Sequence, residues 1–135
     1  MKIIPVVAGI VWNEGRILLA QRLKTDRTFP GKWEFPGGKI EPGEHPKDAL
    51  KRELKEELNL QVHNLRLFEV TTDFTKVNGK DFQFLLIYYE AQSDTKEVVE
   101  LEVETANWVN PGELLEFDLT PADHLIAMKI NKLDY

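Results

Sequence analysis

The chain has 135 residues, of which 42% are hydrophobic and 30% are charged, and its formal net charge is −6. This length predicts a single domain over residues 1–135, whose core needs no disulfide or structural metal. The absence of cysteine excludes disulfides and thiol catalysis and is compatible with the cytoplasm, where we expect the protein to act. The acidic balance argues against DNA or membrane binding, although polyphosphates can bind an acidic protein through metal cations.

The N-terminal part of the chain predicts strands and a loop. Residues 3–12 and 16–22 are mostly apolar and are separated by Asn13-Glu14-Gly15, which predicts a β-hairpin. A signal peptide is the alternative for this apolar start. The run is broken by Pro5, however, and its length and alternation favour a buried strand. Residues 23–33 are expected to form an irregular loop.

The middle of the chain alternates glycine-rich turns with one helix. A short extended piece at 34–35 leads into Pro36-Gly37-Gly38, where two glycines permit backbone geometry that is closed to other residues. A second turn follows at 41–44. His45-Pro46 then begins a helix over 46–58, because proline is well tolerated in a first helical turn.

The rest of the chain mixes strands and helices without regular alternation. Residues 61–76 and 81–92 predict strands joined through an Asn-Gly turn, and 103–109 predicts another strand. A short helix is expected from Pro111, and a last helix begins at Thr120-Pro121 with the threonine as its cap. The fold class is therefore α+β, or a three-layer sandwich.

The helix over 46–58 carries a concentration of negative charge. Glu53, Glu56 and Glu57 are spaced i, i+3 and i+4, where like charges destabilise a helix by about 0.2–0.5 kcal/mol per pair. At 100° per residue they border the apolar stripe, while the cations lie farther round toward solvent (Leu50, Leu54, Leu58; Lys51, Arg52, Lys55). A charged solvent face is one interpretation. A site for hard divalent cations such as Mg²⁺, which prefer carboxylate and phosphate oxygens, is the other.

The spacing around this helix matches a known signature. Gly38 is followed by five residues, Glu44, seven residues, and then the segment 52–60, which reads Arg-Glu-Leu-x-Glu-Glu-x-x-Leu. This pattern resembles the Nudix box of the Nudix hydrolases. Every fixed position matches except one, where Asn59 replaces glycine. Asparagine is the usual second choice for the left-handed residue just past a helix end, so the departure leaves the carboxylates in place.

The resemblance extends along nearly the whole chain, toward MutT-type nucleotide pyrophosphohydrolases. The segment 33–41, WEFPGGKIE, looks like the approach to the box in these proteins, and Ala20-Gln21-Arg22 and Pro121-Ala122-Asp123 are similar too. The family implies an α/β/α sandwich with a mixed β-sheet and a loop–helix–loop catalytic box that binds Mg²⁺ or Mn²⁺. It also implies hydrolysis of a nucleoside diphosphate linked to a further group.

The resemblance also assigns roles within the box. Glu53 resembles the general base that activates water, and Arg52 would orient it, the alternative for Arg52 being a surface ion pair. Glu44 is expected at the edge of the catalytic site, supporting the loop or the outer shell of the metal. The implied metal site consists of the carbonyl of Gly37 and the carboxylates of Glu53, Glu56 and Glu57.

One further metal-binding carboxylate is expected outside the box. MutT-type proteins often supply it about six residues before a tryptophan, and here Trp108 points to Glu102. Glu100 and Glu104 are close alternatives, and any one of the three could belong to the polar part of an exposed strand.

For the substrate, the resemblance points to Arg22, Glu34, Phe35, Gly38 and Asp123, of which Glu34, Phe35 and Asp123 are expected at the base and sugar. Three aromatic residues are candidate pocket walls, with ordinary core packing as the alternative (Phe74, Phe82, Phe84). The MutT-type pattern has asparagine where this chain has Asp123. An ionised aspartate only accepts hydrogen bonds, which favours the amino group of cytosine, whereas a protonated aspartate could donate to an 8-oxopurine carbonyl. A helix-capping or surface acid is the third interpretation.

These features predict Mg²⁺-dependent hydrolysis of (d)NTPs to (d)NMP and pyrophosphate. The purpose would be nucleotide-pool sanitisation, of the 8-oxo-dGTP type or of the CTP or modified-dCTP type. Other Nudix substrates are the alternatives: ADP-ribose, dinucleoside polyphosphates and capped RNA. A non-catalytic nucleotide sensor is disfavoured because such modules lose box glutamates. We expect a nucleoside triphosphate as the partner and a monomer or homodimer as the assembly.

Overall fold

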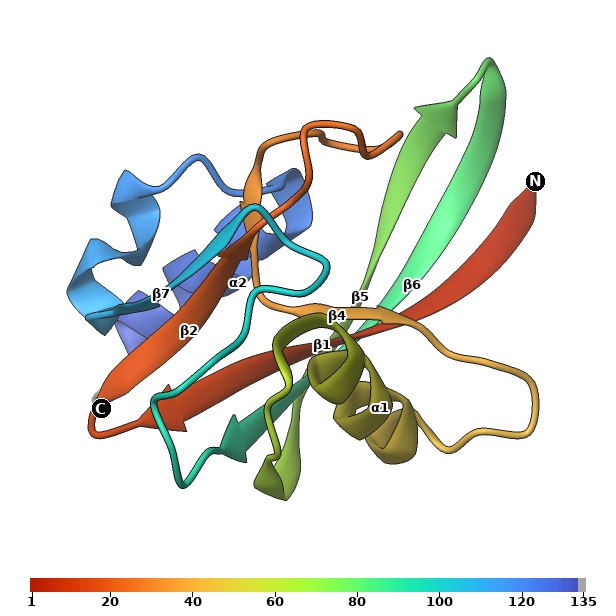
Figure 1. Ribbon diagram of the computed structural model, residues 1–135. Helices are drawn as coiled ribbons and strands as arrows, with labels where there is room; N and C mark the ends of the chain where they lie inside the picture. Colours follow the sequence, from red (N-terminus) through yellow and green to blue (C-terminus); the bar gives the residue numbers. More distant parts are fainter. Residues whose placement is uncertain (134–135) are drawn as a thin grey trace.

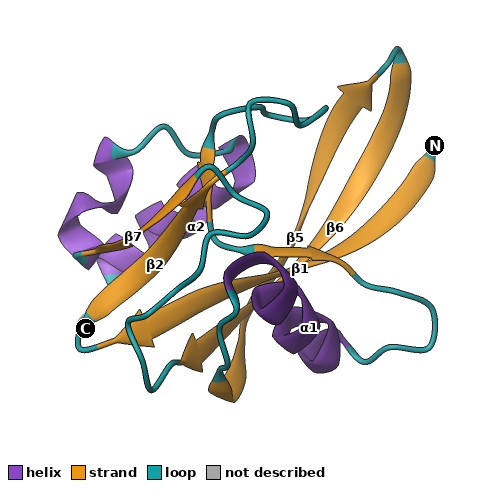
Figure 2. Ribbon diagram, viewed as in Figure 1, coloured by secondary structure: helices purple, strands orange, loops and turns teal. Residues whose placement is uncertain are grey.

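A computed structural model describes residues 1–133 and shows a mixed sheet between two helical layers (Figures 1 and 2). The strand order is β3-β2-β1-β6-β5, with β4 also paired to β1 and β7 to β2. The strands are β1 (Lys2–Asn13), β2 (Arg16–Gln21), β3 (Trp33–Glu34), β4 (Gly37–Lys39), β5 (His63–Val77), β6 (Lys80–Gln92) and β7 (Thr105–Val109). The helices are α1 (Pro46–Leu58), the 3-10 helix η1 (Pro111–Glu116) and α2 (Pro121–Lys132).

Two tight turns join the neighbouring antiparallel strands as the sequence predicts. Glu14-Gly15 has φ values of 48° and 77°, and Asn78-Gly79 has 51° and 77°. Positive φ at both central residues matches the right-handed twist of the flanking strands, and Asn-Gly is the pair that adopts it most readily. The hairpins β1–β2 and β5–β6 are thus encoded locally, whereas the parallel pairing of β1 with β6 is not.

Strand β1 lies at the centre of the sheet and changes partner along one of its edges. Val6 to Ala8 pair with β4, and Trp12 and Asn13 pair with β2, while the other edge pairs with β6 throughout. Between these two pairings, the backbone N–H of Gly9 in β1 donates a hydrogen bond of 2.8 Å to the carbonyl of Pro36, the residue just before β4. The sheet therefore divides at this point, and the cavity described below lies there.

Alternate residues of the central strands face opposite helical layers. Leu50, Leu54 and Leu58 of α1 are fully buried in one cluster, which includes Val7 and Val11 of β1. The other face packs against α2 and η1 through a second cluster (Ala8, Ile10, Ile17, Leu19, Leu114, Ile126, Ile130). Each buried aliphatic side chain stabilises the fold by about 1.5–3 kcal/mol. The α+β, three-layer arrangement expected from the sequence is confirmed, with α1 on one side of the sheet and α2 on the other (Figure 1).

The glycine pair before the helix has a different role from the one expected. Gly37 and Gly38 form strand β4 and neither has a positive φ, so the expectation of special backbone geometry is wrong. Their lack of a side chain allows close approach instead. A Cβ on Gly37 would lie 1.9 Å from the carbonyl oxygen of Val7, and one on Gly38 would lie 2.4 Å from Cδ of Glu53. Packing against the backbone of β1, and not a turn, requires glycine at position 37, whereas a side chain at position 38 would meet the Glu53 carboxyl.

Smaller differences concern the C-terminal third. The strand expected from residue 103 begins at Thr105, and the short helix at Pro111 has 3-10 geometry. Thr120 occupies the position before α2, but its hydroxyl makes no capping hydrogen bond. Within residues 1–133, no helix is long and apolar enough to cross a membrane.

Candidate active site

Helix α1 is delimited by local signals at both ends. His45 precedes the first turn, and its Nδ1 accepts a hydrogen bond from the backbone N–H of Lys47 at 3.1 Å. At the other end Asn59 is left-handed, with φ 50° and ψ 39°, and its N–H donates to the carbonyl of Lys55. Asparagine therefore provides the helix termination that glycine provides in the family pattern. Between these ends lies the row of glutamates.

Arg52 ties the loop before the helix to the helix itself. Its guanidinium donates to both carboxylate oxygens of Glu44, at 2.8 and 3.0 Å, and to the carbonyl of Lys39 at 3.0 Å. It also donates to Glu53 at 3.0 Å and to Glu56 at 3.2 Å. The expectation that Arg52 points toward solvent with the lysines is wrong, because its long side chain folds back over the glutamates. Bidentate bonding of this kind fixes geometry as well as charge.

Glu53 and Glu57 form a carboxyl pair on the inner side of α1. Burial, followed by the charges of Glu34 and Glu53, raises the pKa of Glu57 to about 9, and burial also raises the pKa of Glu53. A hydrogen bond with Glu53 adds to the rise in the pKa of Glu57, so the two carboxyl groups titrate as a pair. Oε2 of Glu57 is buried and has no hydrogen-bond partner among residues 1–133. Glu56 is half exposed and turns toward Arg52 instead.

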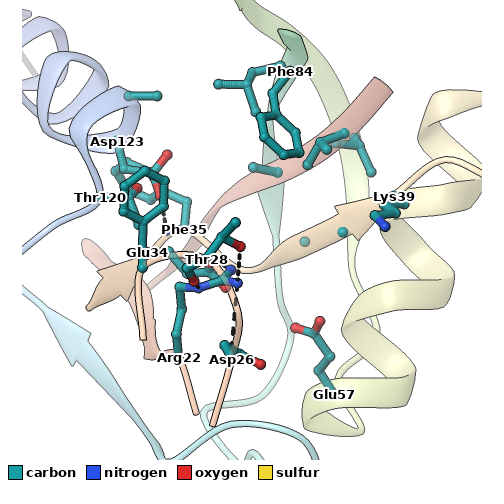
Figure 3. A pocket seen from close by; sticks show the side chains of 18 of the residues that line it. Arg22, Asp26, Thr28, Glu34, Phe35, Lys39, Glu57, Phe84, Thr120 and Asp123 are labelled. Carbon is teal, nitrogen blue, oxygen red and sulfur yellow. Dashed lines mark hydrogen bonds and ion pairs between the residues drawn. The ribbon is translucent and has the colours of Figure 1, made fainter. Parts of the chain in front are cut away.

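A cavity of about 440 Å³ extends from Glu57 to helix α2 (Figure 3). Glu57 projects into it from α1 at one end and Asp123 faces it from α2 at the other, with Arg22 and Glu34 between them. Alternate residues of β6 line the cavity on the side of the sheet (Phe84, Leu86, Tyr88). A volume of this size accommodates one small ligand.

At the α2 end, the Asp123 carboxylate is buried and receives several hydrogen bonds. Its Oδ1 accepts from the hydroxyl of Tyr88 at 2.5 Å, and its Oδ2 accepts from the backbone N–H of Phe35 at 2.9 Å. Burial raises its pKa to about 6, and the hydrogen bonds from Tyr88, Phe35 and Thr120 oppose this rise. Since Asp123 is only 6% exposed, its interpretation as a surface acid is wrong.

Arg22 organises the middle of the cavity. Its guanidinium donates to Glu34 at 2.8 Å and to the carbonyl and hydroxyl of Thr28 at 2.9 and 3.1 Å, and it lies 3.6 Å from Asp26 (Figure 3). Burial raises the pKa of Glu34 to about 7, although the charge of Arg22 lowers it. Arg22 thus connects strand β3 to the loop that follows β2.

The three candidate glutamates near Trp108 have different surroundings. Glu102 lines the cavity, its backbone N–H donates to the carbonyl of Glu57, and its charge contributes to the raised pKa of Glu57. Glu104 accepts from the backbone N–H of Lys24 at 3.0 Å, and Glu100 accepts from Thr105 at 3.4 Å. The geometry therefore places Glu102, and not its neighbours, beside Glu57.

Most residues singled out from the sequence meet at this cavity. Its lining contains eight of them: Arg22, Glu34, Phe35, Gly37, Gly38, Glu57, Glu102 and Asp123. The lining does not contain the other four, which lie on α1 and the preceding loop and are joined to one another through Arg52 (Glu44, Arg52, Glu53, Glu56). Phe84 is a wall as expected, but Phe74 is 63% exposed and neither it nor Phe82 belongs to the lining. Sequence reasoning missed several lining residues, of which the period-2 alternation from Phe84 could have found Tyr88 (Asp26, Thr28, Lys39, Asp73, Leu86, Tyr88).

Comparison with known proteins identifies the arrangement. The family model described as the NUDIX domain matches residues 2–128. This chain is a Nudix hydrolase. It is 35% identical over 127 residues to the CTP pyrophosphohydrolase of Escherichia coli strain K12, covering 91% of this chain and 87% of the relative. It is 33% identical over 128 residues to the nucleoside triphosphatase NudI of Escherichia coli O1:K1, covering 87% and 89%.

Solved structures agree with this assignment. The MutT Nudix hydrolase of Burkholderia pseudomallei superposes with a TM-score of 0.81 at 26% identity, over 96% of this chain and 98% of that one. The solution structure of the Escherichia coli ORF135 protein gives a TM-score of 0.70 at 32% identity, over 98% and 91%. The fold of this chain is thus that of the Nudix hydrolases.

Nudix hydrolases use divalent cations, and the side chains at the Glu57 end fit such an ion chemically. Glu53, Glu57 and Glu102 offer the hard oxygen donors that Mg²⁺ and Mn²⁺ prefer, and Oε2 of Glu57 is buried without a protein partner. In the described chain, however, no three acidic or histidine side chains are arranged to hold one ion. The remaining ligands would be other oxygens, such as those of water or of a substrate phosphate.

Proposed function

We propose that this Nudix hydrolase converts (d)NTPs to (d)NMP and pyrophosphate with Mg²⁺, acting on the free nucleotide pool of the cytoplasm. The observation that carries the proposal is one continuous cavity that joins Glu57 of α1 to Asp123 of α2. One end suits phosphates and the other suits a base. The nucleoside triphosphatase and CTP pyrophosphohydrolase names of the relatives support this direction.

The charge of the cavity explains why a cation is needed. Acidic side chains outnumber basic side chains in its lining. The two basic side chains are Arg22 and Lys39, and the six acidic ones are Asp26, Glu34, Glu57, Asp73, Glu102 and Asp123. A triphosphate would be repelled by such a lining. Mg²⁺ held by Glu57, Glu102 and the remaining box glutamates would neutralise this charge and lower the pKa of a bound water.

Glu53 is suited to act as the general base of the reaction, and its neighbours hold it in position. Glu53 is half-buried, its pKa is raised by burial, and Arg52 holds one of its oxygens at 3.0 Å. A carboxylate with a raised pKa and a fixed position suits a general base. Gly38 leaves room for it, because any side chain at that position would overlap the Glu53 carboxyl. Arg52 and Glu44 therefore act as positioning residues for Glu53.

The dimensions favour a mononucleotide over the alternatives. A cavity of about 440 Å³ accommodates one nucleoside between α1 and α2, whereas ADP-ribose or a dinucleoside polyphosphate brings a second bulky group. In the proposed reaction the phosphates lie at the Glu57 end and the base lies at the Asp123 end.

A phosphate-release screen with added pyrophosphatase tests the proposal. It covers ordinary, oxidised and methylated (d)NTPs, ADP-ribose and dinucleoside polyphosphates, with Mg²⁺ and with chelator. We expect Mg²⁺-dependent release from (d)NTPs, and loss of turnover by about two to four orders of magnitude in Glu53→Gln. Turnover of ADP-ribose in preference to every triphosphate would refute the proposal, as would full activity in chelator.

A further inference from the structure

We propose that the Tyr88 hydroxyl is a specificity-determining group that reads the nucleobase, and that Asp123 sets whether this hydroxyl accepts or donates. The inference rests on the proposed nucleotide hydrolysis and extends it to a substrate class, namely bases carrying an exocyclic amine. It concerns the end of the cavity formed by β6 and α2, away from the glutamates of α1.

The geometry around Asp123 leaves one arrangement of hydrogens when it is ionised. The backbone N–H of Phe35 can only donate, so it fixes Oδ2 as an acceptor at 2.9 Å. The hydroxyl of Tyr88 then gives its one hydrogen to Oδ1 at 2.5 Å. With that hydrogen engaged, the Tyr88 oxygen has only lone pairs left to offer. Thr120 lines the cavity with these two residues, and its hydroxyl also gives its hydrogen to Asp123, so this end presents acceptors alone.

The protonation of both groups supports this arrangement near neutral pH. Burial raises the pKa of Tyr88 far above its usual range, so the hydroxyl keeps its hydrogen. Burial raises the pKa of Asp123 only to about 6, so this carboxyl is largely ionised at pH 7. An acceptor-only end favours an amino group, such as that of cytosine, over a carbonyl oxygen at the same position, such as that of uracil.

An amide at position 123 reverses the polarity through Tyr88. In Asp123→Asn the amide oxygen must face the Phe35 N–H, because an NH₂ group cannot accept from it. The NH₂ group therefore faces Tyr88 and donates to its oxygen. The Tyr88 hydrogen is then free to point into the cavity, where it would favour the carbonyl of uracil. Asp123 is in this sense a positioning residue that acts through Tyr88.

The experiment is a double-mutant cycle on base preference. CTP and UTP differ mainly at the group in question, so the ratio of their kcat/KM values is measured in wild type, Tyr88→Phe, Asp123→Asn and the double variant. The ratio of CMP to UMP dissociation constants provides a second reading that needs no turnover. Tyr89→Phe is the matched control, because Tyr89 is the next residue of β6 and packs on the opposite face with the α1 cluster. Thermal unfolding checks that each variant folds.

We expect wild type and Tyr89→Phe to prefer cytosine, and Tyr88→Phe to reduce that preference about tenfold. Asp123→Asn should shift the ratio toward uracil by tenfold or more in the Tyr88 background and by much less in the Tyr88→Phe background. Equal shifts in both backgrounds would mean that Asp123 reads the base directly, and the inference would be wrong. An unchanged ratio in Tyr88→Phe would refute it while leaving nucleotide hydrolysis intact. Absence of both turnover and binding would overturn it together with the proposed function.

Discussion

Replacing Glu57 with glutamine should stabilise the metal-free protein while weakening its response to Mg²⁺. The carboxyl is half-buried, burial and three neighbouring acids raise its pKa to about 9, and one oxygen has no partner among the described residues. The folded state therefore holds a proton that the unfolded chain, with a glutamate pKa of about 4.5, has already released. Glutamine has nearly the same shape, carries no charge, and can still donate to Glu53.

The sign and size of the effect follow from proton linkage. Because folded wild type binds more protons than unfolded wild type, its stability falls as pH rises from about 4.5 toward 9. The slope is at most about 1.4 kcal/mol per pH unit, and the glutamine variant lacks it. Allowing for partial exposure and for the interaction with Glu53, we expect an advantage of roughly 2–4 kcal/mol at pH 8 and close to none at pH 5.

Thermal unfolding in chelator at pH 5 and pH 8 measures this advantage, each kcal/mol corresponding to about 2–8 °C in Tm. A titration with Mg²⁺ follows, in which wild type should gain about 2.7 kcal/mol at one hundred times the dissociation constant and Glu57→Gln should gain far less. Glu116→Gln, on an exposed part of η1, is the control and should match wild type throughout. A variant that is no more stable than wild type at pH 8, or that responds equally to Mg²⁺, would refute the reasoning.

Three further variants test the box. Asn59→Gly should leave activity unchanged and stability within about 1 kcal/mol, because both residues tolerate the left-handed cap; a loss of kcat would reveal a role beyond termination of the helix. Gly38→Ala should lower kcat about a hundredfold, because the added methyl group would lie against the Glu53 carboxyl. Gly112→Ala is the control and should leave kcat unchanged, because a Cβ at that position meets open space. Similar kinetics for the two variants would contradict this account. The lysine of Arg52→Lys cannot reproduce the bidentate hydrogen bond to Glu44. The free energy of unfolding, measured with denaturant, should therefore fall by about 1–3 kcal/mol, and kcat should also fall. An unchanged kcat would show that Arg52 does not position Glu53.

Locally encoded features were predictable from the sequence. The helix over Pro46–Leu58, its left-handed termination at Asn59 and the two hairpin turns each depend on residues within a few positions of one another. The same holds for the row of glutamates, because spacings of three and four place carboxylates together on any helix. The family pattern added the expectation of an α/β/α sandwich with a mixed β-sheet, and the structure confirms it.

Features that depend on contacts between distant segments were decided only by the tertiary structure. Glycine is needed at Gly37 because β1 passes against β4, and the sequence offered backbone freedom as the reason instead. Arg52 folds back over the box because Glu44 and the Lys39 carbonyl lie within reach.

The base end of the cavity is the clearest case. The sequence by itself determined the positions of the box glutamates and of Asp123 along the chain. It did not determine that Asp123 is buried against Tyr88, a residue 35 positions earlier on a central strand. The hydrogen bond between them exists because β6 and α2 pack together. Burial then sets both the protonation of the acid and the direction of the hydroxyl, and neither property belongs to a residue taken alone.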